Sequence, residues 1–136
     1  MPPTPCLCAT LRKASRSITS LYDAHLKPAG LKVTQYSMLM TIARNPSVAI
    51  SSLADILVMD QTTVTRNLQL LKKKGYVRMD PSPDDQRMKC VTLTATGQAK
   101  LEAAKPLWEQ AQHAVTARLG ELGFDVLLRS LTSVIA

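Results

Sequence analysis

Residues 51–93 contain the pattern that decides the fold: SSLADILVMDQTTVTRNLQLLKKKGYVRMDPSPDDQRMKCVTL. Apolar residues recur at helical spacing over 51–57 and again over 60–74, with a tight link between the two stretches. Ser51 or Ser52 is a suitable N-cap for the first stretch. The segment therefore predicts a short helix, a turn and a longer helix.

The longer helix has clear end signals and is followed by a change of period. Asp60 is a suitable N-cap, and Gly75 suits the position just after a helix end. Residues 76–79 and 89–93 have the composition of short strands, and the segment 81–87 between them is rich in turn-forming residues. Two linked helices followed by a basic hairpin predict a winged helix-turn-helix.

Further helices are expected on both sides of this segment. Their ranges are 7–26, 34–44, 97–119 and 124–135. Pro106 lies inside the third range and predicts a kink or a local break. Gly120 and Gly123 are expected to form the turn before the last helix. The fold class is thus mainly α with a small β-hairpin wing.

The length of 136 residues predicts a single domain over 1–136. The first and last helices carry more apolar residues than a small core can cover, and an exposed apolar face favours association. We therefore expect homodimerisation through helices in 7–30 and 97–136, with two-fold symmetry. Residues 31–96 are expected to form the winged helix lobe that binds DNA.

The charge composition indicates the class of binding partner. The net charge is +7 and the pI is about 9.6, which favours a polyanionic partner. Residues 1–44 carry six basic side chains and one acidic side chain, and residues 60–90 carry seven basic and four acidic ones. The net positive charge therefore lies in the first two-thirds of the chain and not in the apolar tail. This asymmetry suits a basic binding module with a dimerising tail.

Other function classes receive no support from the sequence. No apolar run is long enough to span a membrane, and no secretory signal is evident, so a cytoplasmic protein is expected. Three cysteines do not make a disulfide scaffold. No acid pair, metal-spaced cluster, nucleophile elbow or phosphate-binding glycine loop is visible. We expect neither an enzyme nor a bound metal or cofactor.

The polar face of the helix over 60–74 suits contacts with DNA. Arg can bridge guanine O6 and N7, Gln can bridge adenine N6 and N7, and Thr can contact a phosphate or a thymine methyl. The candidate DNA-contacting residues on this helix are Gln61, Thr62, Thr63, Thr65, Arg66, Gln69 and Lys73. Taken alone, such a face is typical of an ordinary surface helix, but the basic hairpin that follows favours DNA.

The hairpin tip supplies a further candidate contact. The Arg87 guanidinium can enter the electronegative minor groove, and Asp85 is a nearby carboxylate that could hold it in position. The alternative is a surface turn with an ion pair of little energy. A second function class also stays open, a winged-helix module that binds a protein partner and no DNA.

These strings resemble the MarR family of bacterial transcription regulators. The resemblance runs over SLAD at 52–55, DQTTVTRNL at 60–68, LKKKGYV at 71–77, DP at 80–81, DDQR at 84–87 and VTLTATG at 91–97. It implies a homodimer that binds palindromic promoter DNA, usually represses, and leaves DNA when a small phenolic ligand binds or a cysteine is oxidised. By the same resemblance, 61–73 is the recognition helix and Arg87 is the wing arginine, with Asp85 as its partner.

Two cysteines lie at the start of the first helix. A thiolate near a helix N-terminus is stabilised by the helix dipole, so Cys6 and Cys8 are candidate reactive thiols. The stretch from Cys8 to Tyr22 resembles the branch of the family that senses organic hydroperoxides. There the cysteine at Cys8 reacts with peroxide and the tyrosine at Tyr22 comes from the opposite subunit, whereas Arg12 takes the place of a second tyrosine. Small buried hydrophobes or a soft metal site are the alternatives.

The resemblance also implies a ligand pocket between the dimerising helices and the DNA-binding lobe. Its candidate lining residues are Arg16, Tyr22, His25, Tyr36 and Met40. Arg16 would pair with an anion there.

Overall fold

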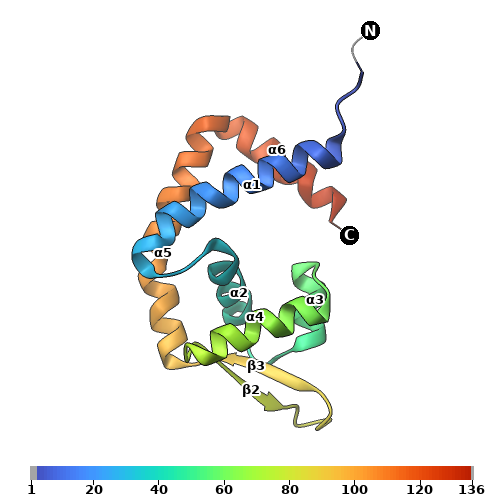
Figure 1. Ribbon diagram of the computed structural model, residues 1–136, viewed down its shortest axis with the longest axis vertical. Coiled ribbons are helices and arrows are strands. Elements are labelled where there is room, and N and C mark those ends of the chain that lie inside the picture. The colour runs from blue at the N-terminus through green and yellow to red at the C-terminus, as the bar shows by residue number, and fades with distance from the viewer. Residues whose placement is uncertain (1–2, 136) are drawn as a thin grey trace. The chain divides into compact units, whose positions relative to one another are not determined.

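The computed structural model describes residues 3–135. Its elements are α1 (Leu7–Leu26), a 3-10 turn η1 (Lys27–Ala29), α2 (Val33–Arg44), β1 (Val48–Ala49), α3 (Ile50–Leu57), α4 (Gln61–Lys73), β2 (Val77–Pro81), β3 (Lys89–Leu93), α5 (Ala95–Leu119) and α6 (Glu121–Val134) (Figure 1). This confirms the mainly α class with a small hairpin wing. The chain divides into two compact units, one of residues up to Val33 and over Leu107–Val134, the other of Thr34–Pro106.

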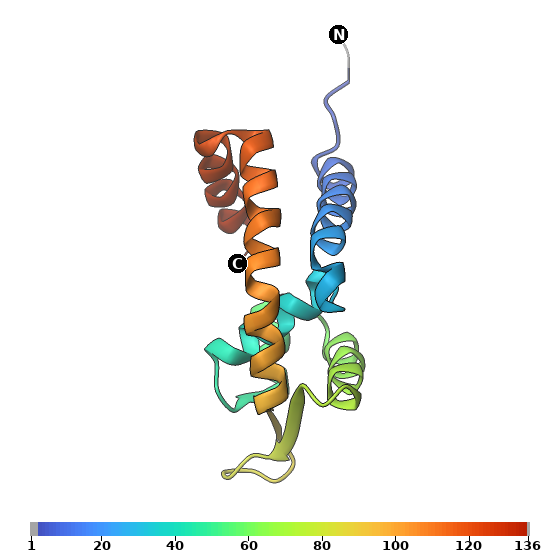
Figure 2. The ribbon, with the colours of Figure 1, turned by 90° about the vertical axis from the view of Figure 1, so that its left-hand side faces the viewer.

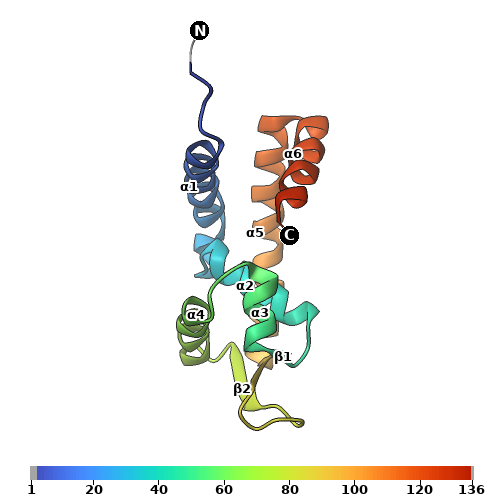
Figure 3. The ribbon, with the colours of Figure 1, turned by 90° about the vertical axis from the view of Figure 1, so that its right-hand side faces the viewer.

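The unit of residues 34–106 is a winged helix-turn-helix. Helices α3 and α4 pack against each other, and the β2–β3 hairpin follows α4 (Figure 3). Each helix buries one apolar stripe, as their spacing predicts. The buried residues of α2, α3, α4 and the sheet include Leu39, Ile42, Leu53, Val64, Leu68, Leu71 and Val91.

The sheet has a third strand that the sequence did not reveal. The strand order is β1-β3-β2, and both pairings are antiparallel. Val48 pairs with Val91, and Ala49 with Cys90. Strand β1 runs directly into α3, so Ala49 is the N-cap and the expected caps Ser51 and Ser52 lie inside the helix.

The terminal helices differ from expectation at Pro106 and at Gly123. Helix α5 runs continuously through Pro106, so the expected local break is absent. Pro106 is exposed, so water can satisfy the carbonyl that loses its helical donor. Gly120 has φ +76 and forms the turn before α6, but Gly123 lies inside α6, which begins three residues earlier than predicted.

The other unit is a small helical cluster. Tyr22, Ala111 and Val115 form its buried centre, with Leu21, Val33, Trp108 and Phe124 packed around them. Helix α6 folds back along the end of α5 (Figure 2). Several large apolar side chains of α1, α5 and α6 remain exposed, namely Leu7, Ile18, Leu119, Leu122, Val126, Leu127, Leu128 and Val134. None of the helices in residues 3–135 is long and apolar enough to cross a membrane.

Candidate nucleic-acid interface

Helix α4 is fixed at its start by its N-cap. The carboxylate of Asp60 accepts hydrogen bonds from the Thr63 backbone N–H (2.8 Å) and from the Thr63 hydroxyl (3.0 Å). These hydrogen bonds hold the pKa of Asp60 below its ordinary value, and the charge of Arg66 lowers it further. Val64, Leu68 and Leu71 are buried beneath the helix, so its opposite face is turned to solvent.

Replacing this cap tests the electrostatic description. Asp60→Ala should lower the melting temperature near neutral pH, because the first turn of α4 loses its acceptor. A carboxyl whose folded-state pKa is lowered stabilises the protein above its ordinary pKa of 3.8, and the contribution is lost as the pH falls through the lowered value. Thermal unfolding by circular dichroism should therefore show a lower melting temperature than the wild type at about pH 7, and this difference should shrink as the pH falls below 3.8. Asp60→Asn keeps a hydrogen-bond acceptor, so its melting temperature should fall less than that of Asp60→Ala. A difference in melting temperature that did not change with pH would contradict this account of the cap.

The candidate residues of α4 divide into an outer face and a cap. Gln61, Thr62, Thr65, Arg66, Gln69 and Lys73 are all exposed. Thr63 is half-buried, and its hydroxyl donates to Asp60. The structure therefore places six of the seven candidates on one accessible face of α4, whereas Thr63 belongs to the cap.

The wing tip is ordered by its own hydrogen bonds. The Asp85 carboxylate accepts the backbone N–H of Arg87 at 2.9 Å, and the Asp85 carbonyl accepts that of Met88 at 3.0 Å. Asp85 thus holds the backbone of Arg87, whereas the sequence suggested a contact with its guanidinium. Arg78 and Asp80 of the wing form an exposed ion pair at 2.7 Å.

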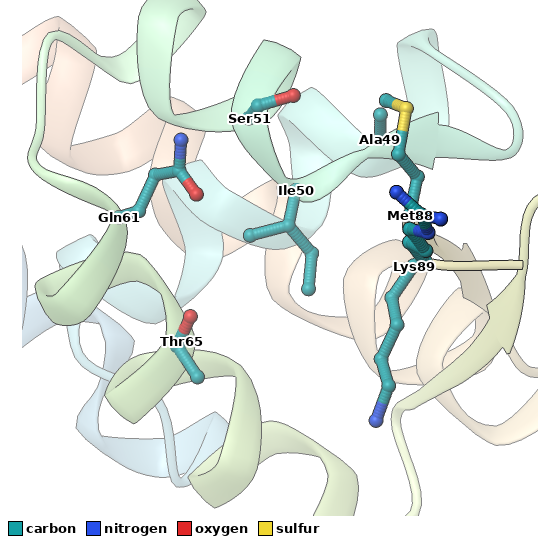
Figure 4. Close-up of a pocket in the computed structure, with 8 residues that line it drawn as sticks. Ala49, Ile50, Ser51, Gln61, Thr65, Met88 and Lys89 are labelled. Carbon is teal, nitrogen blue, oxygen red and sulfur yellow. The ribbon is translucent and has the colours of Figure 1, made fainter. Parts of the chain in front are cut away.

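A groove of about 280 Å³ separates α4 from the base of the wing. Figure 4 shows Gln61 and Thr65 on its α4 side, Met88 and Lys89 on its wing side, and the β1–α3 junction between them. The groove is lined by Ala49, Ile50, Ser51, Gln61, Thr65, Arg87, Met88 and Lys89. Sequence reasoning did not select Ser51 or Lys89 as groove residues. The available signal was the basic side chain of Lys89, two positions after Arg87.

Both cysteines of the first helix are accessible. Cys6 is the N-cap of α1, and Cys6 and Cys8 are exposed, so neither is a buried hydrophobe within one chain. Cys90 is half-buried on β3. In the described residues, no group of three metal-ligating side chains is assembled.

The candidate ligand-binding residues fall in both units. Tyr22 is buried, its hydroxyl donates to Gln112 Oε1, and burial raises the pKa of this phenol. Arg16 is exposed on α1, and the His25 ring Nδ1 lies 2.9 Å from the Leu21 carbonyl oxygen. In the other unit, the remaining two candidates lie on α2, Tyr36 buried and Met40 half-buried.

Comparisons with known proteins identify the family. A family model described as "MarR family" matches residues 29–88, from η1 to the wing. The transcriptional regulator MosR of M. tuberculosis, solved in complex with DNA, is 37% identical over 96% of this chain and 94% of MosR, with a TM-score of 0.87. The chain belongs to the MarR family. The resemblance drawn from the sequence is thereby confirmed.

Two further members are informative. The transcriptional repressor CouR, solved on a 23-mer DNA duplex, is 26% identical over 96% of this chain and 93% of CouR, with a TM-score of 0.88. The regulator SarZ of Staphylococcus haemolyticus is 33% identical over 67% of this chain, and the match spans 62% of SarZ. These MarR-family relatives are transcription regulators, which confirms that the chain is not an enzyme.

Proposed function

We propose that this chain is a homodimeric, sequence-specific DNA-binding regulator that represses transcription from a palindromic promoter site. It leaves DNA when a cysteine is oxidised or a small phenolic ligand binds. The observation that carries the proposal is the exposed polar face of α4 beside the wing, in a chain 37% identical to a regulator solved with DNA. CouR, a repressor on DNA, supports the repressor role.

Charge and exposure agree with DNA as the partner. Arg66 and Lys73 of α4, together with Arg87 of the wing, are exposed. In the described residues none of these cations is in an ion pair with a carboxylate. Phosphates or base edges can therefore bind them without breaking an internal ion pair.

The homodimer is supported by the apolar surface of α6. Leu122 is 76% exposed, Val126 50%, Leu128 48% and Val134 71%. Side chains of this kind gain about 25 cal/mol per Å² when they are removed from water. A symmetric dimer would bury them and would place two copies of α4 on half-sites about 34–36 Å apart.

Cys8 is the proposed peroxide-reactive thiol, with Cys6 beside it in sequence. Both thiols are exposed, so an organic hydroperoxide can reach them within one chain. Fourteen residues of one helix place Tyr22 roughly 21 Å from Cys8, so a contact between them would need the partner subunit. A small phenolic ligand is the alternative effector.

A titration with oxidant tests the switch. Fluorescence anisotropy would follow the reduced protein on DNA from upstream of its own gene, before and after an organic hydroperoxide. Oxidation should weaken wild-type binding by about 5- to 150-fold, the usual range of allosteric coupling. Cys8→Ser should keep its affinity after oxidation, and Cys90→Ser should behave as wild type.

Two other results of this titration would favour a different interpretation. A DNA affinity that is the same before and after oxidation would mean that the cysteines are structural. A phenolic ligand would then be the effector. Failure to bind DNA at low salt would favour the protein-partner module.

A further inference from the structure

The groove between α4 and the wing has a consistent chemical character. Its lining includes the cations Arg87 and Lys89, the hydroxyls of Ser51 and Thr65, and no carboxylate. Lys89 is exposed at the first position of β3, where it pairs across the hairpin with Pro81. The groove is therefore electropositive and rich in hydrogen-bond donors, which suits an anion.

The geometry of B-DNA indicates which anion. A protein that places a helix in the major groove and a wing tip in the adjacent minor groove must straddle the sugar–phosphate strand between them. In this chain the groove lies between those two elements, with Gln61 and Thr65 on the α4 side and Arg87 on the wing side.

The size of the groove also fits. Its volume is about 280 Å³, well above the space that a single water molecule needs. That space can hold a phosphodiester group with part of its sugar.

We infer that the groove holds one backbone phosphate of bound DNA, with Lys89 as its ionic partner and Ser51 as a hydrogen-bond donor. The inference rests on the proposed DNA-binding function. It adds two affinity-determining residues that neither the recognition helix nor the wing tip contains. A phosphate contact carries no sequence information, so both residues should act equally on every DNA sequence.

The test is the salt dependence of binding to a mixed-sequence duplex of about 30 base pairs, measured by anisotropy from about 50 to 200 mM salt. Lys89→Gln should lower the slope of log K against log salt by about 0.9 and weaken binding by about three- to tenfold. Ser51→Ala should weaken binding severalfold with the slope unchanged. Lys89→Arg should keep the wild-type slope. Lys105→Gln, an exposed lysine of α5 outside the groove, is the matched control and should change neither quantity.

The outcomes separate the two proposals. A wild-type slope in Lys89→Gln, with circular dichroism showing a folded protein, would overturn the assignment of the groove while leaving DNA binding intact. An equal loss of slope in Lys105→Gln would also overturn it, because the effect would then be one of net charge. Absence of binding by the wild-type protein would overturn the proposed function itself.

Discussion

Gly97→Ala should lower the free energy of unfolding by about 3 kcal/mol, a large fraction of the stability of a domain of this size. Gly97 lies in the first turn of α5 and packs directly against the backbone of Tyr76. An added Cβ would overlap the Tyr76 carbonyl oxygen and lie 2.9 Å from its carbonyl carbon. Both atoms are backbone, so the clash cannot be relieved by a side-chain rotation. Urea denaturation followed by circular dichroism measures the loss.

The surrounding hydrogen bonds make this contact hard to move. The Tyr76 carbonyl accepts the Thr94 backbone N–H at 3.1 Å. The Thr94 hydroxyl donates to the Gly75 carbonyl at 2.5 Å and accepts the Gly97 N–H at 3.0 Å. A displaced α5 would break these bonds, and Gly75 lies just beyond the end of α4. DNA binding by Gly97→Ala should therefore fall together with stability.

Gly123→Ala is the matched control. Its Cβ would lie 3.7 Å from the Cβ of Leu119, an ordinary contact, and Gly123 is inside α6. Alanine has the higher helix propensity, so this variant should gain about 0.5–1 kcal/mol. Equal effects of the two substitutions would show that Gly97 is required for a reason other than its contact with Tyr76.

The parts of the fold that the sequence predicted well are set by local interactions. Helix α4 needs only its own apolar stripe and the Asp60 cap, and α1 and β3 matched their expected ranges. The two residues of β1 are too few to show a period, and their partners Val91 and Cys90 lie more than forty residues away. Because this pairing fixes where α3 begins, the cap of α3 could not be predicted from its serines.

The candidate site also has one part that follows from local interactions and another that depends on distant segments of the chain. The exposed face of α4 follows from helix geometry, so six of its candidates were placed together from periodicity alone. The groove needs Ser51 and Lys89 in one place, and the pairing of β1 with β3 brings them there. The role of Asp85 depends on the turn conformation at the wing tip, which places its carboxylate on the Arg87 backbone. Ser51 and Lys89 lie far apart in the sequence, so no local signal joins them in one groove.

Arg66→Ala should reduce the preference for the specific DNA site over mixed-sequence DNA by about 1–3 kcal/mol, or roughly 5- to 150-fold. Arg66 is exposed on the outer face of α4, within two turns of its N-terminus, the region that usually lies closest to base edges. Its guanidinium can donate two hydrogen bonds to the O6 and N7 of one guanine, a pattern that no other base presents in the major groove.

Arg66→Lys separates this base contact from simple charge. Lysine keeps the positive charge but lacks the planar fork, so the specificity ratio should fall while the salt slope stays near the wild-type value. Binding of wild type, Arg66→Ala and Arg66→Lys to selected and mixed-sequence duplexes across a salt series measures both quantities. If Arg66→Lys kept full specificity and Arg66→Ala lost affinity equally on all sequences, Arg66 would be a phosphate contact. The base-reading role would then pass to Gln61, Thr65 or Gln69, which share its exposed face of α4.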